Sequence, residues 1–210
     1  MTIDPPSTAV LLIDLQEAFC SPSGSMARQG RSIASSERAA RACDQMAQAA
    51  RAAGITVIWT RYCLRPDYRD GGWYTRELRP NIRANHSLRS DKADSALWSE
   101  LTLAPTDIVI DKPRMSSFYA TPLEAVLRGE EISTLFIGGV TTSMCVETTV
   151  RDASQRDYRT YVVTDACADW AQERHQPSLD AMAFGFAYMT DLAQFTRAAQ
   201  AASGAHSPKP

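Results

Sequence analysis

The chain has 210 residues, of which 44% are hydrophobic, so it is long enough to bury a sizeable core, and we expect one domain over residues 1–210. Its formal net charge of −2 shows no excess of positive charge of the kind that binds nucleic acid or an anionic membrane. Residues 1–6 do not resemble a basic, apolar leader and no apolar run is long enough to cross a bilayer, so we expect a soluble, cytoplasmic protein.

The first half of the chain predicts a β-α-β unit followed by a long excursion. Residues 9–14 form a continuous apolar run that ends in a carboxylate, as expected of a central parallel strand covered on both faces. A long helix at residues 33–53 leads to a second strand at 55–62, which implies a right-handed crossover. Residues 64–103 contain prolines, glycines and scattered charges, and we expect them to form a lid or an interface segment.

The second half continues the alternation of strands and helices. Strands are expected at residues 107–112, 133–139, 159–165 and 188–191, and helices at about 121–129, 143–156 and 175–186. The tail at residues 198–210 shifts to Ala, Ser, Gly and Pro, and we expect it to fray. Together these elements predict a three-layer α/β/α sandwich, in which ligands bind beyond the carboxyl ends of the strands.

Three reactive side chains fall at such strand ends, namely Asp14, Lys112 and Cys145. Cys145 follows a glycine pair and the N-cap residue Ser143, so we expect it in the first turn of a helix. Free N–H groups and the helix dipole would there favour the thiolate and lower the pKa of the thiol. Each residue alone could be structural, as a cap, a solvated strand end or a buried thiol. Together, a base, a cation and a thiol on one rim suit nucleophilic catalysis.

With these motifs the chain resembles the isochorismatase-like cysteine hydrolases, from Leu11 to about Asp191. The motifs are Leu-Ile-Asp14-Leu-Gln-Glu-Ala-Phe19, Asp111-Lys112-Pro with Ser117-Phe-Tyr-Ala-Thr121, and Gly138-Gly-Val-Thr-Thr-Ser-Met-Cys145-Val-Glu-Thr-Thr-Val-Arg-Asp-Ala153. The resemblance implies a six-stranded parallel sheet in the order 3-2-1-4-5-6 and a catalytic triad of Asp14, Lys112 and Cys145. It also implies a cis peptide bond between Val140 and Thr141, and an oxyanion hole formed by the N–H groups of Thr141 and Cys145.

The sequence gives no sign of a metal or another cofactor. The nicotinamidase branch of the family carries Asp-x-His and a further His after the second strand, whereas residues 60–67 here contain no histidine. His86, His175 and His206 are isolated, and we expect them to be structural. The five cysteines are odd in number and lack a C-x-x-C pair, which favours reduced thiols over disulfides or structural zinc.

The thiol at Cys145 favours the amidohydrolase branch of the family, which includes ureidoacrylate, biuret and N-carbamoyl amino acid hydrolases. We expect hydrolysis of a C–N bond in a small amide, ureido or N-carbamoyl compound through a thioester. In this reaction Asp14 takes the thiol proton and Lys112 stabilises the resulting charges. Two alternatives remain open: vinyl ether hydrolysis of an isochorismate-like substrate, and a catalytically silent thiol-reactive or binding protein.

Residues at or just beyond the strand ends are candidates for a substrate pocket, with a place in the core as the alternative. The candidates are Phe19, Trp59, Arg61, Phe118, Tyr119, Met144 and Trp170. A guanidinium at Arg61 could pair with a carboxylate or ureido group of the substrate, or form a salt bridge within the protein.

The resemblance also implies a homo-oligomer, often a dimer or tetramer. The excursion at residues 64–103 agrees, because a monomer would have difficulty covering its aromatic side chains, which are Tyr68, Trp73, Tyr74 and Trp98. We therefore expect a neighbouring subunit to order this segment and to help close the active-site mouth.

Overall fold

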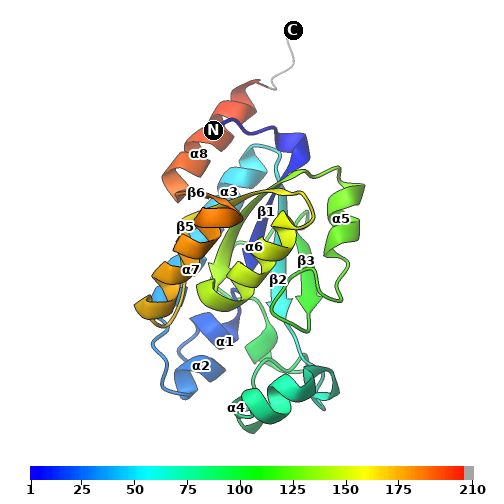
Figure 1. The fold of residues 1–210 in the computed structure, drawn as a ribbon, viewed down its shortest axis with the longest axis vertical. Helices are drawn as coiled ribbons and strands as arrows, with labels where there is room; N and C mark the ends of the chain where they lie inside the picture. The colour runs from blue at the N-terminus through cyan, green and yellow to red at the C-terminus, as the bar shows by residue number, and fades with distance from the viewer. Residues whose placement is uncertain (206–210) are drawn as a thin grey trace.

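The computed structural model describes residues 1–205, and its centre is a six-stranded parallel sheet (Figure 1). The strands are β1 (Thr8–Ile13), β2 (Thr56–Tyr62), β3 (Ile108–Lys112), β4 (Thr134–Val140), β5 (Arg159–Ala168) and β6 (Tyr188–Thr190). Their order is β3-β2-β1-β4-β5-β6, with every neighbouring pair parallel. The predicted fold class and strand order are therefore confirmed, whereas the extent of the single domain stays a prediction.

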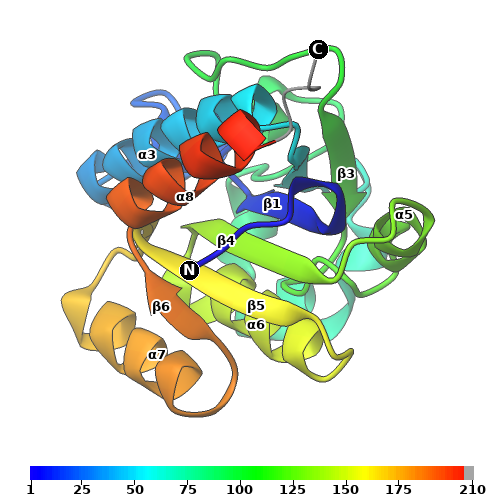
Figure 2. The ribbon, with the colours of Figure 1, turned by 90° about the horizontal axis from the view of Figure 1, so that it is seen from above.

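Helices cover both faces of this sheet. They are α1 (Glu17–Cys20), α2 (Ser25–Arg28), α3 (Ala34–Ala52), α4 (Asn81–Ala84), α5 (Leu123–Gly129), α6 (Glu147–Ser154), α7 (Gln172–Gly185) and α8 (Leu192–Ala205). Seen from above in Figure 2, α3 and α8 lie on one face, while α6 and α7 lie on the other. The short helices α1, α2 and α4 lie beyond the carboxyl ends of the strands (Figure 1). Within residues 1–205, no helix is both long and apolar enough to cross a membrane.

The core follows from the apolar strands. Every residue of β1 is buried, as expected of a central strand with helices on both of its faces. On the face covered by α8, the Phe195 ring lies 5.0 Å from the Phe136 ring of β4. Residues 198–205 continue α8 instead of fraying, with Ala199 buried, and residues 206–210 lie outside the described residues.

The predicted helix at residues 143–156 is interrupted in the structure. A wide π-type turn at Thr142–Val146 comes first, and the regular helix α6 begins only at Glu147. Sequence patterns also did not reveal α1 and α2, which have four residues each and are too short to show a helical period. The excursion at residues 64–103 contains α4 and single turns at Arg69–Gly71, Tyr74–Leu78 and Ala93–Ser95.

Gly139 fixes the close approach of β4 to β1. It pairs with Ile13 and has a φ of 132°, a conformation that side chains with a Cβ rarely adopt. A Cβ at this position would clash with the backbone oxygen of Ile13 and lie 2.6 Å from its nitrogen. The two strands therefore carry Asp14 and the turn that holds Cys145 side by side only because residue 139 has no side chain.

Replacing Gly139 by alanine should destabilise the protein by about 3 kcal/mol or more, because the strained φ and the backbone clash act together. Urea unfolding followed by circular dichroism measures this loss. Gly129→Ala is the matched control, since a Cβ there meets nothing within 4 Å and a helical alanine should be neutral or slightly stabilising. Equal stability of the two variants would contradict the role assigned to Gly139.

Candidate active site

Asp14, directly after β1, is held in place by two neighbouring strands. Its backbone has a φ of 57°, in the left-handed region that aspartate tolerates better than most residues. The hydroxyl of Thr60 on β2 donates to Oδ1 at 2.9 Å, and Lys112 Nζ lies 2.7 Å from Oδ2. The side chains of Asp14 and Lys112 are both 0% exposed, so their ion pair is shielded from water.

Lys112 is a fixed buried cation. Besides its ion pair with Asp14, its Nζ donates to the backbone oxygens of Arg114 and Met115, at 3.0 Å each. Burial lowers the pKa of Lys112, but its interactions with Asp14 and Cys145 outweigh burial and raise it overall. The ammonium group therefore stays charged at neutral pH.

Cys145 lies in the wide turn Thr142–Val146, where it is buried and lines a cavity. The turn follows the peptide bond between Val140 and Thr141, which is cis at the place that the resemblance implies. The sequence had suggested that Cys145 lies in the first turn of a helix. Instead it precedes the regular helix α6, which begins at Glu147.

The pKa of the Cys145 thiol is raised, whereas the sequence had predicted a lowered pKa. Burial raises its pKa to about 12, Lys112 lowers it and Asp14 raises it. The expected lowering by a helix N-terminus is therefore wrong for the free protein, because desolvation of the thiolate dominates. A thiol of this kind becomes a nucleophile only when a neighbouring base takes its proton.

Thr141 brings an unused backbone donor to the same place. Its N–H has no hydrogen-bond acceptor within the described residues, and its carbonyl accepts from the N–H groups of Met144 and Val146 at 3.1 and 3.2 Å. Both Thr141 and Cys145 line the cavity. A free N–H beside a nucleophile suits the binding of an oxyanion.

Asp169, just after β5, anchors the turn that carries the thiol. Its Oδ2 accepts from the backbone N–H and the hydroxyl of Ser143, at 3.1 and 2.6 Å, and Arg174 pairs with Oδ1 at 2.8 Å. Burial raises the pKa of Asp169, but these donors hold it below its usual value, so the carboxylate stays charged. A second anchor is His175, whose Nδ1 lies 2.8 Å from the hydroxyl of Thr142.

Sequence patterns missed Asp169 because they ended the fifth strand too early. The prediction stopped at Asp165, whereas β5 continues to Ala168 and so places residue 169 at the carboxyl edge of the sheet. A carboxylate at a strand end was the signal that found Asp14. The same signal would have found Asp169 if the end of the strand had been known.

A cavity of about 360 Å³ opens onto Cys145. Three of the predicted substrate-pocket residues line it, namely Phe19, Met144 and Trp170. The rings of Phe19 and Trp170 stack with their centroids 6.1 Å apart, which forms one apolar wall. The volume suits a small molecule rather than a polymer.

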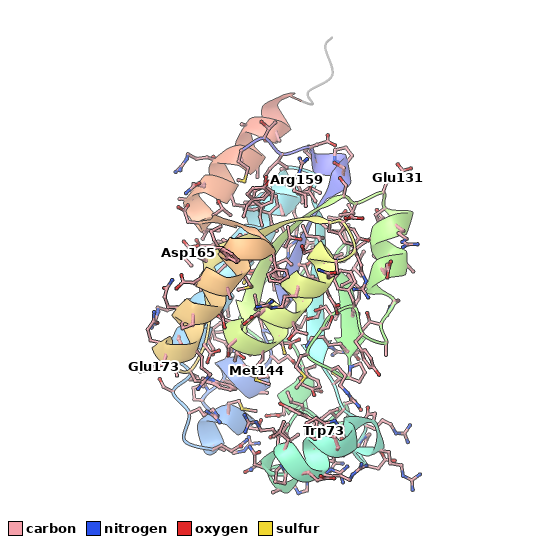
Figure 3. The ribbon with its side chains drawn as sticks, in the orientation of Figure 1. Trp73, Glu131, Met144, Arg159, Asp165 and Glu173 are labelled. Atoms are coloured by element: carbon pink, nitrogen blue, oxygen red, sulfur yellow. The ribbon has the colours of Figure 1, made fainter. Side chains whose placement is uncertain are left out.

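The excursion also contributes to the lining of the cavity. Tyr74, Arg79 and Leu88 all line it, and whether the segment is a lid or an interface stays a prediction. Figure 3 labels Met144 at the carboxyl end of the sheet and Trp73 below it in the excursion. Pattern analysis could not assign these residues individually, because the segment has no regular period.

Arg61 does not line the cavity. Its guanidinium makes two hydrogen bonds to Asp111, at 2.7 and 2.9 Å, on the neighbouring strand β3. Side chains alternate along a strand, so Arg61 and Asp111 share one side of the sheet, while Tyr62 and Lys112 share the other. The prediction of a substrate-binding Arg61 is corrected accordingly, and Tyr62, which the sequence analysis missed, lines the cavity.

Three further candidates also lie outside the cavity. Trp59 is fully buried, with its indole N–H donating to Asp107 at 2.8 Å. Phe118 stacks on Tyr158 with ring centroids 5.9 Å apart, and Tyr119 is 59% exposed. These side chains belong to the core or the surface, which is the alternative that the sequence analysis had left open.

Within residues 1–205, no group of three or more His, Cys, Asp or Glu side chains is arranged to hold a metal ion. The predicted structural residue His206 lies outside the described residues.

Replacing Lys112 by methionine should destabilise the protein by about 3–5 kcal/mol, because Asp14 would remain buried without its partner. The double variant Asp14→Asn with Lys112→Met removes both charges and should recover much of this loss, and asparagine also tolerates the left-handed backbone. Urea unfolding of both variants and the wild type measures the difference. A single variant as stable as the wild type would show that the pair is not shielded as the structure indicates.

Comparison with known proteins assigns the chain to a family. Residues 8–194 match the family model of the isochorismatase domain. A ureidoacrylate amidohydrolase RutB from Methylobacterium radiotolerans is 34% identical, over 94% of this chain and 81% of that protein. A protein of the same name from Azorhizobium caulinodans is 31% identical, over 91% of this chain and 89% of that protein.

Solved structures agree with this assignment. A cysteine hydrolase from Pseudomonas syringae pv. phaseolicola has a TM-score of 0.88 at 30% identity, and the match covers 96% of both chains. N-carbamoylsarcosine amidase from Thermoplasma acidophilum has a TM-score of 0.71 at 23% identity, covering 89% of this chain and 96% of that chain, which shows a shared fold. The chain belongs to the isochorismatase family.

Proposed function

We propose that this protein is a cysteine amidohydrolase that cleaves a C–N bond of a small amide or ureido compound through a thioester on Cys145. One observation carries the proposal: a buried ion pair of Asp14 and Lys112 adjoins a buried thiol at a cavity of small-molecule size. Hydrolysis of a C–N bond is also the reaction named for the ureidoacrylate amidohydrolases that resemble this chain over most of its length.

In the proposed mechanism, Asp14 takes the proton of Cys145 and the thiolate attacks the carbonyl carbon. The N–H groups of Thr141 and Cys145 bind the oxyanion, and Lys112 stabilises the negative charges nearby. Asp14 then gives the proton to the nitrogen that leaves, as ammonia or an amine. It next takes a proton from a water molecule, whose oxygen attacks the thioester carbon, and passes that proton to the sulfur of Cys145 as the C–S bond breaks.

The high pKa of Cys145 is compatible with this scheme. Proton transfer from the thiol to Asp14 moves a negative charge from one buried atom to its neighbour, while Lys112 keeps its positive charge. The net charge of the site stays the same, so the transfer avoids the full desolvation penalty that raises the thiol pKa. A thiolate formed in this way exists only beside its base.

A panel of small amides and ureido compounds, assayed for release of ammonia or amine, tests the proposal. Cys145→Ala should lower kcat/KM at least a hundredfold, because only binding and the oxyanion hole remain. Mass spectrometry of acid-quenched wild-type enzyme should show an acyl group on the peptide that contains Cys145. Cys43→Ala is the matched control, since this buried thiol lies on α3 outside the cavity and its removal should leave most of the activity.

Two results would contradict the proposal. Residual activity above about one per cent in Cys145→Ala would exclude the thiol as the nucleophile. Release of pyruvate from isochorismate, without any release of ammonia or amine from the panel, would favour vinyl ether hydrolysis instead.

We also propose that the protein is a homo-oligomer of the cytoplasm. Trp73 of the excursion is 58% exposed, which is unusual for so large an apolar side chain. By contrast, Tyr68 and Trp98 are covered within the single chain, so the expectation that a monomer cannot cover them is wrong. The five unpaired cysteines suit a reducing compartment.

Light scattering at micromolar concentration should give a mass that is a multiple of the 23.1 kDa chain. Trp73→Ala should shift the protein towards the single chain, because a buried tryptophan often dominates an interface. Phe184→Ala, which removes an exposed apolar side chain of α7 outside the excursion, serves as the control. A wild-type mass equal to one chain would refute the oligomer.

A further inference from the structure

The mouth of the cavity carries more positive than negative charge. Three arginines line the cavity, Arg31, Arg79 and Arg174, and the one carboxylate that lines it with them is Asp169. That carboxylate is already paired with Arg174 at 2.8 Å and bonded to Ser143 at 2.6 Å. Among residues 1–205, neither Arg31 nor Arg79 has a carboxylate within 4.0 Å of its guanidinium, although the protein as a whole has a net charge of −2.

Arg31 is held by stacking rather than by an ion pair. Its guanidinium carbon lies 4.4 Å from the centre of the Trp170 ring, and Trp170 stacks in turn on Phe19. A guanidinium that stacks through its face keeps the N–H groups of its edge free to donate. An unpaired arginine is thus positioned on the apolar wall of the cavity.

Arg79 lies on the excursion and lines the same cavity as Cys145. Its backbone N–H donates to the carbonyl of Tyr74 at 2.7 Å, and Tyr74 is also a lining residue. A second arginine without a carboxylate partner therefore lines the cavity, on a different segment from Arg31.

Two buried donors of residues that line the cavity have no acceptor in the described part of the chain. They are the indole N–H of Trp170 and the hydroxyl of Tyr62, and both side chains line the cavity. Tyr62 is only 4% exposed, and the indole N–H can donate but cannot accept. A cavity with unused donors and uncompensated positive charge is complementary to a ligand that is anionic and rich in acceptors.

We propose that Arg31 and Arg79 form a subsite that binds a carboxylate of the substrate. This inference rests on the proposed function, and it narrows the substrate to a small ureido or amide acid that binds as an anion. The carboxylate binds at the mouth, while the scissile carbonyl reaches Cys145 and Thr141. Arg31 and Arg79 therefore take the role that the sequence had suggested for Arg61.

The test compares an acid with its uncharged isostere. Ammonia release is measured from 3-ureidopropionate and from 3-methylbutylurea, in which a branched alkyl group replaces the carboxylate. The wild type should prefer the acid at least a hundredfold in kcat/KM. Arg31→Gln and Arg79→Gln should each lower this ratio at least tenfold, chiefly by raising KM for the acid, because the contact is made in both the ground and transition states.

Arg76→Gln is the matched control, because this exposed arginine lies on the same turn as Tyr74 but does not line the cavity. It should keep the wild-type ratio, and Arg79→Lys should give an intermediate one. A wild-type ratio near one would overturn the anion subsite. An unchanged ratio in both glutamine variants would overturn the assignment of Arg31 and Arg79.

Calorimetric titration separates failure of the inference from failure of the proposed function. If the wild type hydrolyses neither compound, 3-ureidopropionate should still bind to it, and the double variant Arg31→Gln with Arg79→Gln should lose that binding at least tenfold. Such a result would keep the subsite and reject ureido hydrolysis. Equal binding of the acid to both proteins, or no binding to either, would reject the subsite.

Discussion

The buried ion pair of Asp14 and Lys112 is the constraint on which the rest of the site depends. Two opposite charges without solvent are costly to bury unless their attraction and further hydrogen bonds offset the lost hydration. Here Thr60 donates to Oδ1 of Asp14 and the ammonium group donates to the carbonyls of Arg114 and Met115, while Oδ2 has only the ion pair with Lys112. The strand order explains how these groups meet, because β3, β2 and β1 are neighbours and their carboxyl ends lie at one edge of the sheet.

In the proposed mechanism, the same pair makes the thiol reactive only beside its base. Burial favours the protonated form of Cys145, and oxidants and alkylating agents that attack thiolates react poorly with a protonated thiol. In that mechanism, Asp14 and the fixed cation Lys112 lower the free-energy cost of forming the thiolate where the substrate carbonyl binds. Asp169 contributes by holding the turn through Ser143, so the thiol and the free N–H of Thr141 keep their relative positions.

The sequence predicted those parts of the molecule that repeat with a period. Strands and the long helix α3 follow from apolar runs, and Asp14, Lys112 and Cys145 stood out because reactive side chains followed such runs. The prediction that Arg61 binds the substrate was wrong because residues 61 and 62 point to opposite sides of β2. Only residue 62 is in register with Lys112 and lies on the same side of the sheet. That register depends on how β2 and β3 pair, which a single strand does not reveal.

Residues from the irregular segments could not be predicted, because tertiary contacts place them. Asp94 illustrates this: its carboxylate accepts from the backbone N–H of Ser25 in α2 and from the N–H of Leu88 in the excursion, at 2.8 Å each. Arg31 follows α2 and Arg79 precedes Leu88, so one buried carboxylate ties together the two segments that carry the unpaired arginines. A subsite held in this way is organised before the ligand arrives, which reduces the entropy lost on binding. If the proposed subsite holds, the excursion is part of the recognition surface, and its fixed position lets exposed arginines select a substrate for a buried thiol.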